Sequence, residues 1–320
     1  MRRLSTIGFL VICAAGGTLV GAGQRGVGQN PSGLPLTPTL RERGSSVTPA
    51  FEGWYYDKDG AQNFLVGYFN RNTKQELDIP VGPNNRIEPG NPDQGQPTHF
   101  NPGRAWGLFA FKVPKDLGNQ KMTWTIVANG LTNTITLHTQ ADYIVEPFMD
   151  AANKNTPPTL KFQPTGAPFT GAPNGIAEKY TATAGAPLVL TVWASDEGPK
   201  INIPEARGRG RGGRGATGAA PAGARANVPA EFQPAPPLAL TWSVYRGPGS
   251  VKFDNPKPSI DRNNGGKAVA NATFSAPGDY ILRIQGNDST GDGGGGFQCC
   301  WTNALVGVSV GPATSTSGER

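Results

Sequence analysis

The sequence is poor in the residues that most often carry catalysis. Its 320 residues include only two histidines, His99 in a proline-rich stretch and His138 in a predicted strand over residues 134–145. A zinc centre built on several histidines is therefore not expected. The sequence also lacks a Gly-x-Ser-x-Gly elbow, a His-Glu-x-x-His pair and a phosphate-binding loop. These absences predict a chain that is not an enzyme.

Long apolar runs are absent beyond the N-terminus. Arg2 and Arg3 precede an apolar run over residues 7–20, and small residues at 20–22 suit cleavage by a signal peptidase. Residues 1–22 are therefore predicted to be a signal peptide, and the chain to be periplasmic, extracellular or on the cell surface. No later segment has the ~20 apolar residues of a membrane span, so none is expected after cleavage.

Charged residues are also few, at 16% of the chain, and the formal net charge is +6. Arg2 and Arg3 belong to the predicted signal peptide. Five more arginines lie in one glycine-rich stretch: Arg207, Arg209, Arg211, Arg214 and Arg225. Leaving out these seven arginines lowers the charge from +6 to −1, so the folded parts are expected to be nearly neutral. A nucleic-acid partner is not expected for an exported chain.

Cysteine is scarce as well, with three residues. Cys13 leaves with the signal peptide, so Cys299 and Cys300 remain. An adjacent pair in an exported protein has three open states: free thiols, a vicinal disulfide, or pairing with another chain. One hypothesis makes the pair a redox switch, and the alternative makes it inert, with one thiol facing the core. Neighbouring cysteines cannot cross-link two sheets, so the cores must hold the fold.

The sequence does contain many short runs of β-branched and aromatic residues closed by Gly, Pro, Asn or Asp, most clearly over residues 238–310. Such runs are typical of antiparallel strands. The fold class predicted is all-β, with two β-sandwich domains. The predicted segments are a signal peptide (1–22), a disordered leader (23–46), an N-terminal β-sandwich (47–148), a linker (149–175), a second β-sandwich (176–312) and a disordered tail (313–320). An Arg-Gly-rich insertion at 203–236 has too few large apolar residues to offset its ordering entropy and is expected to be disordered.

The second predicted domain contains two telling runs: Trp242-Ser243 followed by Gly-Pro-Gly, and Thr-Phe-Ser-Ala-Pro-Gly-Asp-Tyr over 273–280. These runs resemble the bacterial PKD-like, immunoglobulin-like β-sandwich modules of secreted proteins. The resemblance implies a core position for Trp242, a tyrosine corner at Tyr280 and a role as an interaction unit or spacer. The N-terminal half resembles an uncharacterised domain of secreted bacterial proteins, which implies no activity.

In an immunoglobulin-like sandwich, the loop after the second strand and the loop before the last strand lie at the same end. Four acidic residues are expected there: Asp196, Glu197, Asp288 and Asp292. Carboxylates and carbonyls on loops are the ligands Ca²⁺ prefers, so calcium is the one candidate cofactor. The alternative is that these residues are turn formers that face water.

Two further sets are candidate binding residues. The first is Trp54, Tyr55 and Tyr56, which cannot all point inward on one strand. An exposed ring among them would suit stacking on a sugar ring. The alternative is that this ring packs under the loop at 82–104. The second is the arginines of the insertion, Arg207, Arg209, Arg211 and Arg214. They would suit phosphates or acidic glycans, and the alternative is a low-complexity insertion without a ligand.

The function predicted is a non-enzymatic binding, adhesion or structural module at the cell surface. Its expected partner is an extracellular or periplasmic protein or a polysaccharide. The alternative is a polysaccharide-acting hydrolase that uses a pair of carboxylates about 5 to 10 Å apart.

Overall fold

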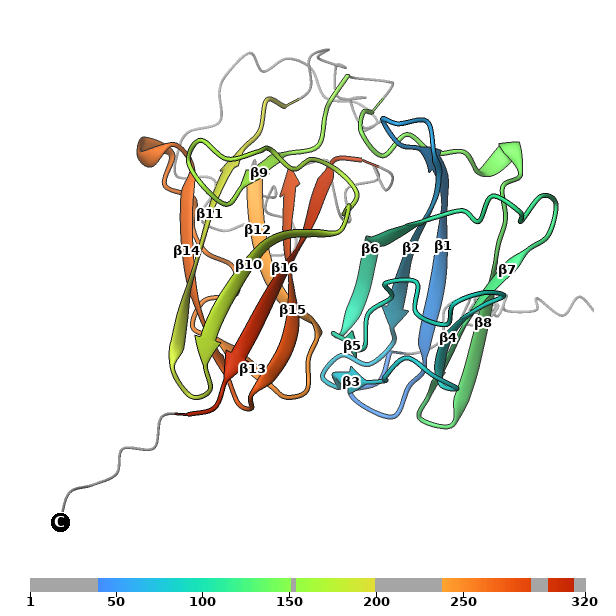
Figure 1. Ribbon diagram of the computed structural model, residues 1–320, viewed down its shortest axis with the longest axis horizontal. Coiled ribbons are helices and arrows are strands. Elements are labelled where there is room, and N and C mark those ends of the chain that lie inside the picture. The colour runs from blue at the N-terminus through green and yellow to red at the C-terminus, as the bar shows by residue number, and fades with distance from the viewer. Residues whose placement is uncertain (1–39, 151–153, 199–237, 289–298, 314–320) are drawn as a thin grey trace, which may run out of the picture. The chain divides into compact units, whose positions relative to one another are not determined.

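The computed structural model describes residues 40–150, 154–198, 238–288 and 299–313, which belong to one compact unit, Leu40–Arg320. In these residues the regular structure is β-strand with two short 3-10 helices and no α-helix (Figure 1). The predicted all-β class is confirmed. Over the same residues, no helix has the length and apolar character that crossing a membrane requires. The predicted signal peptide, most of the leader and the Arg-Gly-rich insertion lie outside the described residues.

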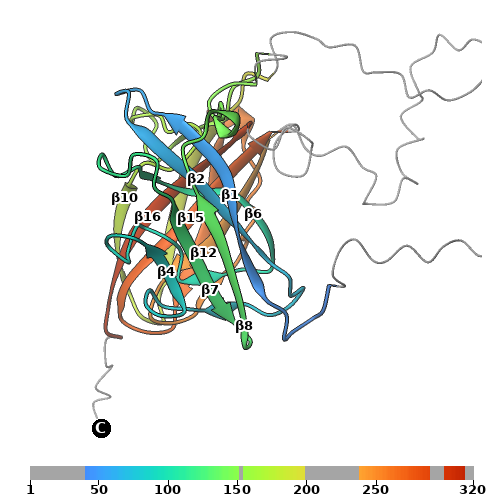
Figure 2. The ribbon, with the colours of Figure 1, turned by 90° about the vertical axis from the view of Figure 1, so that its right-hand side faces the viewer.

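The first half, residues 40–150, forms three small antiparallel sheets with strand orders β1-β2-β6, β4-β7-β8 and β3-β5. Its elements are β1 (Val47–Tyr56), β2 (Gln62–Asn70), β3 (Leu77–Asp78), β4 (Asn85–Glu88), β5 (His99–Phe100), β6 (Gly103–Lys112), β7 (Met122–Ala128), β8 (Leu131–Leu137) and η1 (Ala141–Tyr143). Figures 1 and 2 show β7 and β8 beside β1, so two sheets face each other across a core.

Strand β2 lies at the centre of the first half because its side chains are buried on both faces. Phe64, Val66 and Tyr68 belong to the main core of this half, together with residues of β7 such as Trp124. Leu65 points to the other face and packs in a separate cluster. A strand covered on both sides needs a continuous apolar run, which β2 has.

The second half, residues 154–313, forms two four-stranded sheets with orders β10-β16-β15-β12 and β13-β14-β11-β9 (Figure 1). Its elements are β9 (Thr159–Lys161), β10 (Ile176–Thr183), β11 (Pro187–Ser195), β12 (Leu238–Arg246), β13 (Val251–Phe253), η4 (Arg262–Asn264), β14 (Lys267–Phe274), β15 (Gly278–Asp288) and β16 (Trp301–Gly311). All pairs are antiparallel except β10 with β16, which run parallel.

This strand order is that of an immunoglobulin-like sandwich. In their order within the sheets, β9, β11, β14 and β13 take the places of strands A, B, E and D, and β12, β15 and β16 take those of C, F and G. Two predicted landmarks are confirmed: Trp242 is buried in the core, and the Tyr280 hydroxyl donates to the Ala276 carbonyl at 2.9 Å. The second half is therefore an immunoglobulin-like β-sandwich held by packing.

The predicted segment boundaries remain predictions, but two observations bear on them. Residues 149–175, predicted as a linker, include β9, which pairs with β11 at the edge of a sheet. Residues 40–46 of the predicted leader lie against the turn after β2, where the Ser45 amide donates to Asn72 Oδ1 at 2.7 Å. Both segments form contacts with elements outside them.

The two halves share a buried contact at Trp301, the first residue of β16. Its ring packs against Gly107 of β6, where an added Cβ atom would lie 1.9 Å from the indole. Gly107 also has a φ of +46°, so both the backbone conformation and the lack of space beside Trp301 favour glycine at this position. Asn303, on the same strand as Trp301, donates its amide to the Gly107 carbonyl at 3.0 Å. Tyr55 and Leu65 of the first half join Trp301 and Ala172 of the second in one buried cluster.

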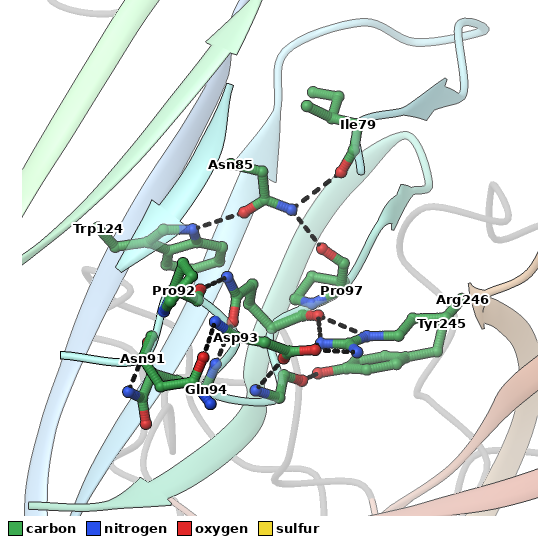
Figure 3. Close-up of polar contacts among 12 residues, drawn as sticks. Ile79, Asn85, Asn91, Pro92, Asp93, Gln94, Pro97, Trp124, Tyr245 and Arg246 are labelled. Atoms are coloured by element: carbon green, nitrogen blue, oxygen red, sulfur yellow. Dashed lines mark hydrogen bonds and ion pairs between the residues drawn. The ribbon is translucent and has the colours of Figure 1, made fainter. Parts of the chain in front are cut away.

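A second contact between the halves is polar and involves the proline-rich loop at 82–104. The guanidinium of Arg246, the last residue of β12, donates to both carboxylate oxygens of Asp93 at 2.8 and 3.0 Å and to the Gln96 carbonyl (Figure 3). The neighbouring Tyr245 hydroxyl donates to the Gly95 carbonyl. We call these five residues the clasp.

The clasp loop is also fixed within the first half. The buried Asn85 amide donates to the carbonyls of Ile79 and Pro97 at 2.9 and 2.7 Å, and its Oδ1 accepts from the Trp124 indole at 3.0 Å (Figure 3). A long irregular loop in a compact domain is often functional or disordered. The segment at 82–104 instead contains strands β4 and β5, is fixed by the hydrogen bonds of Asn85 and joins the two halves.

Candidate functional site

The candidate site is built on β1, an edge strand of the sheet β1-β2-β6. Its pairing with β2 shifts register between Phe51 and Gly53. Because of this bulge, Phe51, Trp54 and Tyr56 share one face of the strand, whereas Tyr55 faces the opposite side. Alternation alone would have put Phe51 and Trp54 on opposite faces.

The chain after β8 returns along β1 and adds two more rings to this face. The Val145 amide donates to the Trp54 carbonyl at 2.9 Å, and the Trp54 indole donates to the Gln140 carbonyl at 2.8 Å. The approach is close because Gly53 has no side chain; a Cβ atom there would lie 2.6 Å from the Tyr143 carbonyl oxygen. This return brings His138 and Tyr143 beside Phe51.

We call Phe51, Trp54, Tyr56, His138 and Tyr143 the aromatic strip. Tyr143 stacks on Phe51 with ring centroids 5.7 Å apart, and His138 meets Tyr143 edge to face at 4.4 Å. At the other end, Trp54 meets Tyr56 at 5.3 Å. Tyr56 and Tyr143 are about half exposed, at 53% and 47%, whereas Trp54 is buried. The strip therefore presents two tyrosine rings to solvent on a rigid aromatic base.

The strip carries little charge of its own. Burial lowers the pKa of His138, and the positive charge of Lys121 lowers it further, so the imidazole is neutral at pH 7. Ile144, which is 51% exposed, adds apolar surface next to Tyr143. Flat, uncharged rings held at an exposed edge suit stacking against the C–H face of a sugar ring or another apolar ring.

The structure separates the three aromatic residues that the sequence analysis grouped. Tyr56 is exposed, and Trp54 is buried beside it in the core cluster that also contains Ile87 and Phe100 of the segment at 82–104. Tyr55 lies on the opposite face against Phe148, at 5.4 Å, and burial, with the nearby Asp57 charge, raises its pKa to about 12. Sequence reasoning did not single out Tyr143, because it falls in a segment predicted as strand. The polar run Thr139-Gln140-Ala141-Asp142 before it is the signal that the strand ends.

Three of the four predicted acidic residues meet at one end of the second half. Burial raises the pKa of Asp196, and the negative charges of Asp288 and, less strongly, Glu197 raise it further. Asp288 accepts a hydrogen bond from the Asn155 amide. Asp292 lies outside the described residues, and within the described ranges no three His, Cys, Asp or Glu side chains are arranged to hold a metal. The calcium site stays a prediction.

Cys299 and Cys300 form a vicinal disulfide, one of the three states left open by the sequence. Both residues are buried, with exposed fractions of 4% and 0%. The Asp288 amide donates to the Cys300 carbonyl at 3.4 Å, so the disulfide lies beside the acidic end. A redox role stays a prediction. The candidate arginines Arg207, Arg209, Arg211 and Arg214 lie outside the described residues.

A cleft of about 420 Å³ is lined by residues of both halves, among them Asp57, Asp59 and Asn303. Hydrogen bonds from the Ala61 amide and the Asn63 side chain hold the pKa of Asp57 below its ordinary value. A glycosidase acid needs the opposite shift, so Asp57 is not suited to that role. The turn at Asp57 closes the hairpin between β1 and β2 through the Gly60 amide, at 3.0 Å.

No protein-family model matches the chain, and no curated protein is similar to it in sequence. Among solved structures, domains 1–6 of the surface layer protein SbsC are 11% identical, with a TM-score of 0.23; the match covers 86% of this chain and 29% of that one. A titin immunoglobulin tandem is 9% identical, with a TM-score of 0.21, and the match covers 84% of this chain and all of the tandem. The immunoglobulin-like assignment therefore rests on the strand order above.

Proposed function

We propose that the chain is an exported, non-enzymatic recognition module that binds a neutral polysaccharide through the aromatic strip. The observation that carries this proposal is the pair of half-exposed tyrosines, Tyr56 and Tyr143, each backed by a second ring. A contiguous patch of exposed apolar surface often marks a binding site, and preorganised rings lose little entropy on binding. The resemblance of the second half to PKD-like modules supports a role at the cell surface or in the periplasm.

The strip suits a sugar chain better than a compact apolar ligand. Phe51 and Tyr56 lie five residues apart on β1, so the strip is drawn out by about 16 Å along the strand. That length matches several consecutive sugar rings. The strip has no carboxylate among its members, which favours a neutral chain over a cationic partner.

The test is retention of the full-length chain on insoluble neutral polysaccharides such as cellulose, chitin and xylan. Tyr56→Ala and Tyr143→Ala should each weaken retention about tenfold, since one stacking contact contributes about 1 to 3 kcal/mol. Tyr143→Phe keeps the ring and should retain binding. Leu131→Ala is the matched control, because Leu131 is also half exposed but lies on β8 outside the strip. Equal retention of all variants, or none of the wild type on any of these polymers, would overturn the proposal.

A further inference from the structure

A second candidate site lies on the outer face of the sheet β13-β14-β11-β9. Along β11, side chains alternate between core and surface: Leu190, Val192 and Ala194 are buried, whereas Trp193 faces outward. Trp193 pairs directly with Lys161 of β9 on one side and with Lys267 of β14 on the other. The three outward side chains therefore form a row across three strands, with an indole between two ammonium groups.

The two lysines of this row lack an opposing charge. Neither Lys161 nor Lys267 makes an ion pair anywhere in the part of the chain that the structure describes. The Lys267 ammonium lies 5.9 Å from the centroid of the Trp193 ring. Their strands flank β11, so the two lysine backbones are about 10 Å apart. The row therefore combines an aromatic surface with two positive charges that form no ion pair with any described residue.

A hollow of about 420 Å³ surrounds the row and is also lined by Asn263, Asn264 and Gly265. The loop that carries them is fixed: Asp261 accepts from the Asn263 amide at 3.0 Å, and Gly266 lies so close to Ala194 that a Cβ atom would meet its carbonyl oxygen at 2.1 Å. The side chains of Asn263 and Asn264 make no hydrogen bond within the described ranges. Two side-chain amides at a fixed position thus add donors and acceptors to the hollow.

We infer that this hollow binds an acidic saccharide, a sugar unit that carries a carboxylate or a sulfate. A pyranose ring offers a C–H face for the Trp193 indole, its hydroxyls suit Asn263 and Asn264, and its acid group complements Lys161 and Lys267. Charge complementarity selects this ligand over a neutral sugar. The indole between the lysines can stack on a sugar ring, so it favours an acidic saccharide over a polyanion without rings. The site is separate from the aromatic strip and does not depend on the function proposed for it.

The test measures binding of the full-length chain, by affinity electrophoresis and calorimetry, to four soluble polymers. These are polygalacturonate for the carboxylate, chondroitin sulfate for the sulfate, dextran as a neutral ring polymer and poly-L-glutamate as a polyanion without rings. We expect binding to one or both acidic polysaccharides, weakened by salt, and much weaker binding to dextran and polyglutamate. The preferred acidic polysaccharide identifies the acid group.

The variants separate stacking from charge. Trp193→Ala should weaken binding about tenfold, whereas Trp193→Phe, which keeps a ring, should weaken it less. The double variant Lys161→Gln/Lys267→Gln should remove most of the salt dependence. Lys252→Gln is the control, because Lys252 is an exposed lysine on β13 of the same sheet. Near-ultraviolet circular dichroism checks that each variant is folded.

Three results would overturn the inference: binding of polyglutamate as tight as that of the acidic polysaccharides, binding unchanged in folded Trp193→Ala, or a loss as large in Lys252→Gln as in the double variant. Absence of binding to both acidic polysaccharides would do the same. None of these results bears on the proposal for the aromatic strip, because that proposal is tested with neutral polymers and other variants.

Discussion

At the scale of single residues, Gly107 is the position where the fold has least tolerance. Its positive φ favours glycine, and the Trp301 indole fills the space where a side chain would begin. Gly118 has a similar φ of +53° but open space around it. The two glycines therefore separate the effect of backbone strain from that of steric overlap.

We expect Gly107→Ala to lower the free energy of unfolding by about 3 kcal/mol, from strain and overpacking together. Gly118→Ala should cost only about 1 kcal/mol, because strain acts alone there. Urea denaturation of both variants measures the difference. Equal losses would mean that Trp301 does not occupy the space beside Gly107.

Asp196 gives a second prediction at this scale. Its raised pKa means that the folded state favours the protonated acid, so this carboxyl lowers stability as pH rises above the unfolded value of 3.8, and the loss persists at neutral pH. Asp196→Asn should therefore raise the melting temperature at pH 7 and leave it almost unchanged at pH 3.

Asp254 is the control, because its pKa is shifted in the opposite direction from that of Asp196. Hydrogen bonds from Asn271 lower its pKa, so its contribution to stability is present above 3.8 and is lost in acid. Asp254→Asn should lower the melting temperature at pH 7. If Asp196→Asn lowers it too, and added calcium stabilises only the wild type, the predicted metal site gains direct support.

At the scale of elements, the clasp fixes the segment at 82–104 to the end of β12. Asp93 meets Arg246 through two hydrogen bonds, and this contact, ahead of other causes, lowers the pKa of Asp93. The contribution of the pair is thus present above the ordinary aspartate pKa of 3.8 and is lost as pH falls below it.

Arg246→Ala should lower the free energy of unfolding by about 2 kcal/mol, because it also leaves the Gln96 carbonyl without its donor. A double-mutant cycle with Asp93→Asn should give a coupling of about 1 kcal/mol at pH 7 and a smaller one at pH 3, where the Asp93 carboxylate begins to be protonated. Arg86→Ala, which breaks an exposed pair with Glu88, should change stability by less than about 0.5 kcal/mol. A similar loss for Arg86 and Arg246 would contradict a specific clasp.

Elements specified by local sequence were predictable, and elements specified by distant partners were not. Tyr280 follows Pro277-Gly278-Asp279, a turn that is readable in four residues, and its corner was predicted. Strand β9 has three residues in a proline-rich segment and exists because β11 offers it an edge. The aromatic strip depends on Tyr143 stacking on Phe51, 92 positions earlier, and on a bulge in β1 whose sequence signal is the glycine within the strand, Gly53.

At the scale of the whole molecule, the described halves are joined by a buried cluster as well as by the clasp. Tyr55 and Leu65 pack with Ala172 and Trp301, so neither half can unfold without exposing apolar surface of the other. We expect a single calorimetric transition with matching van't Hoff and calorimetric enthalpies.

Trp301→Ala should split this transition in two, because it removes the largest side chain of the shared cluster and leaves a cavity between the halves. Trp193→Ala is the control, since Trp193 lies on an outer face. A single transition in Trp301→Ala would mean that the remaining contacts, among them the clasp and the Asn303 hydrogen bond to Gly107, are enough to couple the halves. Two transitions in the wild type would mean that the shared cluster couples them weakly.

The parallel pairing of β10 with β16 has a mechanical consequence. Past the short edge strand β9, the chain enters β10 at Ile176, and it leaves β16 at Gly311, at the opposite end of the same ladder. A tensile force between the first half and the C-terminal side would pull the two strands past each other along their length. Rupture then requires the hydrogen bonds that join residues 176–183 of β10 to β16 to fail together, whereas a hairpin pulled at its open end loses its hydrogen bonds one at a time.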